Sequence, residues 1–329
     1  MRILIAGDYQ DAVRHLPCFR KLQGHSVQVS TAAAPDTATL VRHAADAQAL
    51  VLIRERTRID AALLAQLPKL RLISQTGRIG THLDLAACTA RGVAVAEGVG
   101  SPVAPAELAW ALLMAASRRL PAYRDALLGG HWQATGDAHL GRSLDGLTLG
   151  LWSYGKIGRR VAAYGRAFGM RVLVWGGDES CAQARADGFD VAASRAALFA
   201  DSDVLSLHRR LVAATRHQIV LDDLLRMKPD ALLVNTSRAE LIAPGALLAA
   251  LDAGRPGQAA LDVFEHEPVL DPQHPLLRHP RVLATPHLGY VEQASYDLYF
   301  GAAFDNVLAF AAGTPQHLAN PEVLESRPD

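Results

Sequence analysis

The sequence predicts an α/β protein built on two doubly wound parallel sheets, and three observations predict it. Short apolar runs alternate with helix-like segments along nearly all of the 329 residues. Half of the residues are hydrophobic, which is enough to bury two sheets on both faces. The alternation is interrupted at GVGSPVAPAE, residues 98–107, where glycines and prolines are typical of a crossing between domains.

The first domain is predicted from five apolar runs, which are expected to form parallel strands. They are RILIAG at 2–7, SVQVS at 26–30, ALVLI at 49–53, LRLIS at 70–74 and VAVAE at 93–97. Helices are expected between them: one ending near Leu22, and others near 37–46, 60–66 and 83–90. The first domain is expected to end near Glu97.

The second domain is expected to begin with a helix at about 106–118 that is apolar all round and therefore buried, either between domains or between subunits. Further apolar runs predict a second parallel sheet of about six strands, with helices near 194–200, 216–226 and 244–252. The runs lie at 147–152, 170–175, 189–193, 203–208, 230–236, 258–264 and 281–287. A last helix at about 291–312 is expected to end at Gly313, with Pro315 behind it.

Composition excludes several function classes. The chain has 33 basic and 33 acidic residues, so the sequence predicts no binding to nucleic acid or to an anionic membrane. Three distant cysteines, Cys18, Cys88 and Cys181, have no spacing typical of a metal site. The first residues are typical of a strand and not of a signal peptide, and the longest apolar helical run, 108–116, is too short to span a bilayer. A soluble, cytoplasmic protein is expected.

A glycine turn at SYGKIG, residues 153–158, stands between an apolar strand and a helix. Gly155 and Gly158 occupy the second and third glycine positions of the G-x-G-x-x-G dinucleotide motif, whereas Ser153 replaces the first. A glycine pair alone is weak evidence, because glycines also mark ordinary turns. The surrounding strand–turn–helix–strand pattern favours a dinucleotide site, with the pyrophosphate at the helix N-terminus.

Polar residues follow four of the predicted strands of the second domain. Because ligands of open α/β sheets bind outside the carboxyl ends of the strands, these residues are candidates for a common site. They are Ser206 and His208; Asn235, Thr236, Ser237 and Arg238; Asp262, Glu265 and Glu267; and His287. Each taken singly is better explained as a surface or loop residue, but an arginine, a carboxylate and a histidine at one edge predict hydride-transfer chemistry.

In this order and spacing, these segments resemble the D-isomer-specific 2-hydroxyacid dehydrogenase family, which includes D-3-phosphoglycerate dehydrogenase. The resemblance covers essentially the whole chain, and it is carried by the following segments: LRLISQTGRIG at 70–80, the helix around Glu107, SYGKIG, DVLSLH at 203–208, MKPDALLVNTSR at 227–238, AALDVFEHEP at 259–268 and TPHLG at 285–289. It implies a Rossmann NAD-binding domain at 100–290 and a smaller, discontinuous, flavodoxin-like substrate domain at 1–99 and 291–329.

The resemblance also implies the catalytic residues. Arg238 would hold the substrate carboxylate and carbonyl through its planar guanidinium, which lysine lacks. His287 would act as the acid and base at the carbonyl oxygen, with Glu267 as its partner. No metal is implied. The reaction expected is the interconversion of a D-2-hydroxy acid and its 2-keto acid with NAD, and D-3-phosphoglycerate is one candidate substrate.

The expected binding residues fall into two groups. Cofactor contacts are expected from Ser153, Tyr154, Gly155, Lys156, Ile157, Gly158, Gly176, Asp178, His208, Thr236, Ser237 and Asp262, with Asp262 on the nicotinamide side. For His208 the backbone is expected to line the site while the side chain has no catalytic part. Substrate contacts are expected from Arg54, Gly77, Arg78, Ile79, Gly80 and Arg238, because the TGRIG backbone at 76–80 can offer N–H groups to an anion. Arg56 is as well explained as a solvated charge.

Three departures from the family pattern concern the cofactor. If position 153 needs a positive φ, Ser153 introduces strain of roughly 1 to 3 kcal/mol; the interpretation favoured from the sequence is that φ is ordinary and the hydroxyl joins the turn. Gly176 stands where an acidic residue usually accepts the ribose hydroxyls, with Asp178 two residues later. Arg209 and Arg210 replace an apolar residue and a proline. NAD is expected, and NADP stays open.

Two other functions remain open on the sequence alone: a dinucleotide-sensing binding protein resembling the corepressors of this fold, and a catalytically idle homologue. Neither requires Arg238, Glu267 and His287 together. A homodimer formed through the NAD-binding domain is expected as well. Since the chain ends at Asp329, the additional regulatory domain of feedback-inhibited relatives is not expected.

Overall fold

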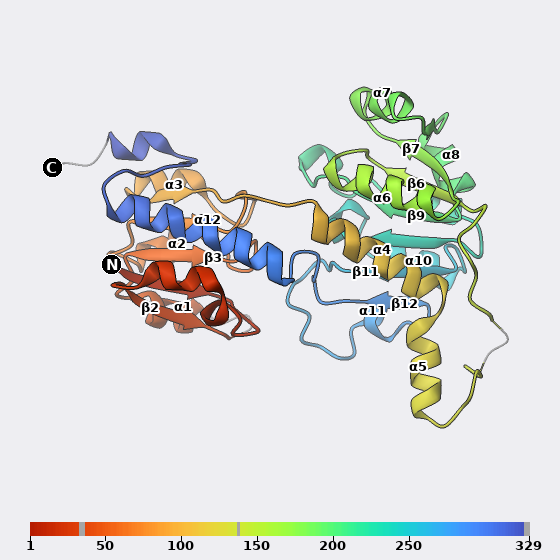
Figure 1. The fold of residues 1–329 in the computed structure, drawn as a ribbon, viewed down its shortest axis with the longest axis horizontal. Coiled ribbons are helices and arrows are strands. Elements are labelled where there is room, and N and C mark those ends of the chain that lie inside the picture. Colours follow the sequence, from red (N-terminus) through yellow and green to blue (C-terminus); the bar gives the residue numbers. More distant parts are fainter. Residues whose placement is uncertain (33–36, 137–138, 326–329) are drawn as a thin grey trace. The chain divides into compact units, whose positions relative to one another are not determined.

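The computed structural model describes residues 1–32, 37–136 and 139–325, and within them the chain forms two compact units. One unit comprises Met1–Ser101 with Val291–Asp329, and the other comprises Pro102–Tyr290. Both are α/β units with a fully parallel sheet (Figure 1). The predicted fold class is therefore confirmed.

The sheet of the first unit has five parallel strands in the order β2-β1-β3-β4-β5. This is the flavodoxin-like order, in which the direction of winding reverses between β1 and β3. All five predicted strands are present, and β3 and β4 are buried along their whole length, as expected of a sheet covered on both faces. Their bounds are β1 Arg2–Ala6, β2 Ser26–Ser30, β3 Ala49–Leu52, β4 Leu72–Gln75 and β5 Ala94–Ala96.

Helices of the first unit are α1 Thr37–Ala44, α2 Ala61–Ala65, α3 Leu85–Ala90 and the long α12 Gln293–Ala311. The helix predicted to end near Leu22 is instead two short 3-10 helices, Val13–His15 and Pro17–Leu22. Pro17 explains the break, because it cannot continue the preceding turn. Packing of α12 against β4 includes a hydrogen bond from Ser74 Oγ to the carbonyl of Ala303 at 2.8 Å. The returning C-terminal segment is thus part of the first unit's core.

The sheet of the second unit has seven parallel strands in the order β12-β11-β10-β9-β6-β7-β8. The order is that of a doubly wound dinucleotide-binding fold with one further strand, and its winding reverses between β6 and β9. The strands are β6 Thr148–Trp152, β7 Arg171–Trp175, β8 Asp190–Val191, β9 Val204–Leu207, β10 Leu232–Asn235, β11 Gln258–Leu261 and β12 Val282–Ala284. The sequence predicted about six strands in this sheet, one fewer than the seven observed.

Helices of the second unit are α4 Val103–Ser117, α5 Leu120–Leu128, α6 Lys156–Ala167, α7 Asp178–Ala186, α8 Arg195–Asp201, α9 Leu221–Leu225, α10 Ala246–Asp252 and α11 Pro275–Arg278. One face of the largely apolar α4 packs against α6, β10 and β11 of its own unit (Figure 1), whereas Val103, Glu107 and Ala111 are exposed, so packing within the unit buries only part of this helix. The sequence did not predict α5, α7 or α11. The helix expected at 216–226 is shorter, because a 3-10 turn at Ala213–Thr215 and an extended segment precede α9.

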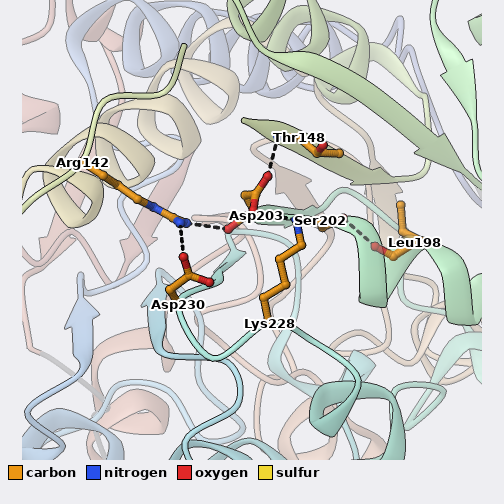
Figure 2. Close-up of polar contacts among 7 residues, drawn as sticks. All are labelled: Arg142, Thr148, Leu198, Ser202, Asp203, Lys228 and Asp230. Carbon is orange, nitrogen blue, oxygen red and sulfur yellow. Dashed lines mark hydrogen bonds and ion pairs between the residues drawn. The ribbon is translucent and has the colours of Figure 1, made fainter. Parts of the chain in front are cut away.

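A polar network ties the segment after α5 to the amino ends of the strands (Figure 2). Arg142 forms an ion pair with Asp230 at 3.0 Å and donates to the backbone carbonyl of Asp203 at 2.8 Å. The Asp203 carboxylate accepts hydrogen bonds from Lys228 Nζ at 2.7 Å and from the backbone N–H of Thr148 at 2.8 Å. Burial alone would raise the pKa of Asp203, but these donors outweigh burial and hold the pKa below its usual value. The network fixes where the chain re-enters the sheet.

Over the described ranges, no helix is long and apolar enough to cross a membrane. Cys18 is partly buried, and Cys88 and Cys181 are buried; none forms a disulfide. Burial raises the pKa of the Cys88 thiol to about 12, so this thiol is an inert core group.

Candidate functional site

The glycine turn lies at the carboxyl end of β6, beside the point where the winding of the sheet reverses. Ser153 follows β6 directly, its backbone N–H donates to the carbonyl of Trp175 at 2.7 Å, and its φ is 86°. The position therefore needs the positive φ that glycine adopts freely, and the interpretation of an ordinary φ is wrong. The Ser153 hydroxyl makes no hydrogen bond with any residue that the structure describes, so it does not join the turn either.

The turn fits a dinucleotide phosphate on structural grounds. Gly155 caps the N-terminus of α6, and a Cβ added to it would meet nothing within 4 Å. A Cβ on Gly158 would lie 2.5 Å from the carbonyl oxygen of Ser153, so only glycine allows the helix to start this close to the strand. Lys156 and Ile157 form the first turn of the twelve-residue α6, whose N–H groups and dipole favour an anion.

Tyr154 is the exception among the predicted turn residues, because its side chain belongs to the core. It is 3% exposed and donates a hydrogen bond from its hydroxyl to Asp187 at 2.8 Å. Burial, reinforced by Asp187, raises the pKa of Tyr154 to about 12. Only the backbone of Tyr154 is left for the predicted cofactor contact.

At the end of β7, Gly176 and Asp178 occupy the positions predicted to face the adenosine ribose. Asp178 is exposed and is the first residue of α7, where a carboxylate stabilises the helix N-terminus. A Cβ on Gly176 would lie 3.1 Å from the Cβ of Ser180 and 3.5 Å from the Cα of Ser153. A larger residue at this position would therefore need only a small shift of the Ser180 side chain.

At the end of β9, His208 lies next to the glycine turn. Its backbone N–H donates to the carbonyl of Trp152 at 3.0 Å, and its Cβ is 3.8 Å from the place that a Cβ on Gly158 would take. The ring Nε2 is 3.0 Å from the hydroxyl of Ser206. Burial lowers the pKa of His208 to about 4, so the imidazole is neutral at pH 7.

At the end of β10, a buried asparagine organises the loop that carries Arg238. Asn235 is 1% exposed; its amide nitrogen donates to the carbonyl of Arg238 at 3.0 Å, and its amide oxygen accepts from the backbone N–H of Ser237 at 3.0 Å. Arg238 also donates to the carbonyl of Ser237 at 2.6 Å. Thr236 and Ser237 are partly buried. Because the Asn235 amide is hydrogen-bonded to the backbone of both Ser237 and Arg238, the backbone from which the Arg238 side chain extends is fixed.

His287 and Glu267 form a close pair between the loops that follow β11 and β12. The distance from His287 Nδ1 to Glu267 Oε2 is 2.5 Å, and the two side chains are 25% and 32% exposed. The other carboxylate oxygen, Glu267 Oε1, accepts the backbone N–H of Phe264 at 2.9 Å. The ring of Tyr290 packs edge-on against His287, with centroids 5.6 Å apart. The pairing leaves Nε2 as the ring nitrogen of His287 for chemistry.

Asp262 braces the loop that carries His287. It is fully buried, and its Oδ1 accepts from the hydroxyl of Thr285 at 2.6 Å and the backbone N–H of Leu288 at 2.7 Å. Its Oδ2 accepts from the N–H of Gly289 at 2.9 Å. Burial, the largest influence, raises the pKa of Asp262 in spite of these donors. All three bonds go to residues 285–289; the predicted contact with nicotinamide stays a prediction.

In the first unit, much of the predicted anion-binding loop is already in use. The N–H groups of Thr76, Gly77 and Ile79 donate to Leu52, Gln75 and Glu97. Within the described chain, the backbone N–H groups of Arg78 and Gly80 make no hydrogen bond, and the exposed Arg78 side chain has no partner there. These two N–H groups are the loop's remaining donors to a ligand.

Arg54 and Arg56 contact their own unit. Arg54 has a positive φ of 51°, and its Nη1 lies 2.1 Å from the place of a Cβ on Gly77 and donates to the Thr76 carbonyl at 3.4 Å. Arg56 donates to the carbonyl of Gly7 at 2.5 Å and stacks 4.2 Å from the ring centroid of Tyr9. The φ of Gly77, 114°, is a conformation that residues with a Cβ rarely adopt, and it explains the glycine at this position.

Sequence reasoning missed two supporting groups, the bracing roles of Asp262 and Asn235. Asn235 is the last residue of β10, and Asp262 directly follows β11. Both are buried, and a buried polar side chain without hydrogen-bond partners destabilises the fold. An isolated Asp or Asn directly after an apolar run is the signal that would have found them.

Comparisons with known proteins agree over both units of the chain. The family model described as "D-isomer specific 2-hydroxyacid dehydrogenase, NAD binding domain" matches residues 110–289. A glyoxylate reductase of Aeropyrum pernix is 37% identical over 300 residues, which cover 89% of this chain and 89% of that protein. A Ralstonia solanacearum structure, provisionally described as a D-3-phosphoglycerate dehydrogenase oxidoreductase, is 54% identical with a TM-score of 0.96 and 98% of both chains covered. A phosphoglycerate oxidoreductase structure from Vibrio cholerae is 54% identical, with a TM-score of 0.93 and coverage of 95% and 99%.

Proposed function

Since this chain belongs to the D-isomer specific 2-hydroxyacid dehydrogenase family, we propose that Arg238, Glu267 and His287 carry out its NAD-dependent interconversion of a D-2-hydroxy acid and a 2-keto acid. The observation that carries the assignment is the 2.5 Å pair of His287 and Glu267. A histidine in this pairing keeps one nitrogen, Nε2, for a substrate oxygen, while the carboxylate orients the ring.

In the reductive direction, the Arg238 guanidinium holds the substrate carboxylate and the adjacent carbonyl through parallel hydrogen bonds. NADH, when bound, would supply the hydride for the keto carbon. His287 donates the Nε2 proton to the carbonyl oxygen, which becomes the hydroxyl, and Glu267 holds the ring in position through Nδ1. In the oxidative direction, neutral His287 accepts the hydroxyl proton at the same nitrogen.

Residues around the β6 turn would hold the cofactor. Ser153, Gly155 and Gly158 shape the turn, and the N–H groups at the start of α6 would take the pyrophosphate. Gly176 and Asp178 would lie on the ribose side. Thr236, Ser237 and His208 follow the neighbouring strands and would line the remaining cofactor contacts, His208 as a neutral group.

The substrate we propose is a small unphosphorylated 2-keto acid of the glyoxylate type, after the relative of that name. A phosphorylated substrate would carry a second anionic group, and Arg54, Arg56 and Arg78 of the first unit are the candidates to bind it. Arg54 and Arg56 already contact their own unit. Arg78 and the N–H groups of Arg78 and Gly80 are proposed to contribute to substrate binding from the discontinuous unit, residues 1–99 and 291–329. A phosphorylated acid is the second candidate, after the Ralstonia and Vibrio relatives.

The test is a panel of glyoxylate, pyruvate, hydroxypyruvate and 3-phosphohydroxypyruvate, assayed with NADH and with NADPH. We expect glyoxylate or hydroxypyruvate to give the highest kcat/KM. His287→Gln should lower kcat by about 10² to 10⁴-fold. Arg238→Lys should raise KM and lower kcat together, because the planar fork orients the reacting carbon as well as binding it.

A direct NADH titration is the control for both variants, and each should bind NADH with the affinity of the wild type. If Arg238→Lys kept normal substrate kinetics, or lost NADH affinity first, Arg238 would not be the substrate clamp. A clear preference for 3-phosphohydroxypyruvate would replace the proposed substrate class by the phosphorylated one.

We also propose that the chain forms a homodimer through the segment around α5. None of the nine residues of α5 is buried, and it extends away from the sheet of its own unit (Figure 1). Large apolar side chains on and after it are exposed: Leu128 by 71%, Trp132 by 77% and Leu140 by 83%. The Arg142 network holds the returning end of this segment at the amino ends of the strands (Figure 2), so the apolar groups are presented from a fixed base.

A further inference from the structure

Arg209 and Arg210 stand at the place in the second unit where a dinucleotide is expected, and the assigned chemistry uses neither. β6 pairs with β7 on one side and with β9 on the other, so the direction of winding reverses between β6 and β9. In open α/β sheets the ligand lies at this reversal, outside the carboxyl ends of the strands. The glycine turn follows β6, and the two arginines follow β9 after His208.

Hydrogen bonds to β6 and to the loop after β10 fix the backbone around Arg209. The preceding His208 donates its N–H to the carbonyl of Trp152, the last residue of β6, at 3.0 Å. The carbonyl of Arg209 accepts the hydroxyl of Ser237, from the loop after β10, at 2.8 Å. The carbonyl of Arg210 accepts the hydroxyl of Thr215 at 2.8 Å. Arg209 therefore starts from a rigid position between the glycine turn and the loop that carries Arg238.

The side chain of Arg209 contains a buried N–H donor without a hydrogen-bond acceptor in the described chain. Its Nε is shielded from solvent and has no hydrogen-bond partner, and its guanidinium forms no ion pair with any residue in the described ranges. A buried donor of a charged group without an acceptor is unfavourable, and native proteins rarely keep one without a reason. Arg210 differs, because it is exposed and its donors are open to water.

We infer that Arg209 binds a phosphate group of the dinucleotide, and that this contact supplements the N–H groups at the start of α6. The inference rests on the proposed cofactor position. Its chemistry is that of a guanidinium fork with phosphate oxygens, a strong charge-assisted pairing. Two sources carry such a group, the pyrophosphate of either nicotinamide cofactor and the 2′-phosphate of NADP.

The experiment measures binding without catalysis. ADP-ribose and 2′-phospho-ADP-ribose are titrated into the wild type and into Arg209→Gln, Arg209→Lys and Arg210→Gln by calorimetry. Arg209→Gln should weaken ADP-ribose by about 10- to 100-fold, the usual range for a hydrogen bond to a charged group. Arg209→Lys should lose less, because it keeps the charge, and the matched control Arg210→Gln should bind as the wild type does.

The two phosphate sources give different patterns. Equal weakening of both ligands by Arg209→Gln places the contact at the pyrophosphate, and weakening of 2′-phospho-ADP-ribose alone places it at the 2′-phosphate. Unchanged binding of both ligands, or an equal loss in Arg210→Gln, would overturn the inference. Wild-type binding of ADP-ribose without turnover of any keto acid would defeat the proposed function and leave the role of Arg209 standing.

Stability of the ligand-free protein separates this role from a structural one. Removing an unsatisfied buried donor should leave the melting temperature of Arg209→Gln equal to or above that of the wild type. The shift in melting temperature on adding ADP-ribose should shrink. A variant that melts earlier without ligand would identify Arg209 as a structural residue and refute the assignment.

Discussion

Replacing Ser153 by glycine should stabilise the second unit, because the native φ of residue 153 is 86°. A residue with a Cβ held in a sparsely populated φ region stores about 1 to 3 kcal/mol of strain. Glycine removes that strain but loses more conformational entropy on folding, which opposes the gain by about 0.5 to 1 kcal/mol. The expected net gain in the free energy of unfolding is about 1 kcal/mol.

The backbone around position 153 allows the substitution without other losses. The hydrogen bond from its N–H to the carbonyl of Trp175 is kept in the glycine variant. The hydroxyl has no partner within the described chain, so removing it leaves no buried group unsatisfied. Ser153→Ala is the matched control: it also lacks the hydroxyl but keeps the Cβ and therefore the strain. Its stability should lie within about 0.5 kcal/mol of the wild type.

Urea denaturation followed by tryptophan fluorescence reports on this unit alone. All four tryptophans, Trp110, Trp132, Trp152 and Trp175, lie within Pro102–Tyr290. A gain of 1 kcal/mol corresponds to a rise in melting temperature of about 2 to 4 °C for a unit of this size. If Ser153→Gly were no more stable than Ser153→Ala, the strain argument would be refuted. If both variants were equally stabilised, the hydroxyl and not φ would be the unfavourable feature.

His208→Gln should flatten the dependence of stability on pH between 6.5 and 4. The unfolded chain takes up a proton at this histidine as pH falls through 6.5, whereas the folded chain does so only near 4, so stability is full above pH 6.5 and falls by up to about 3 kcal/mol across this window. Urea midpoints at several pH values measure the slope, with His131→Gln, at an exposed site, as the control; an unchanged slope would show that the folded protein protonates His208 near its ordinary pH. For the homodimer, Leu128→Glu should yield monomers in sedimentation equilibrium with an unchanged fluorescence spectrum, and a wild type that is itself monomeric would contradict the proposal.

The fold was predictable because its signals are local. Strands buried on both faces appear in sequence as short apolar runs, and every strand in the described ranges falls on such a run. The family resemblance, the enzyme class and the NAD cofactor predicted from the sequence are confirmed by the comparisons. α5 escaped prediction for a physical reason: its exposed apolar residues serve no core of its own unit, so its pattern indicates no buried face.

The conformation of Ser153 could not be predicted, because φ is set by tertiary packing. Serine prefers negative φ, and the sequence alone favours that preference. The strand before it, the bond to Trp175 and the close start of α6 at Gly158 together impose the positive value. A local preference of about 1 to 3 kcal/mol is overridden when several contacts fix the chain on both sides.

The site shows the same contrast between residues that the sequence predicts and conformations that tertiary packing sets. The family resemblance pointed to Arg238, Glu267 and His287, but neither it nor the residue pattern pointed to the groups that hold their loops. Asp262 makes three hydrogen bonds to residues 285–289, and losing one such acceptor would leave donors of Thr285, Leu288 and Gly289 unsatisfied inside the protein. His287 itself has a positive φ of 52°. A histidine in so unfavourable a conformation stays there only because its loop is held, so the reach of Nε2 depends on a carboxylate that need never touch the substrate.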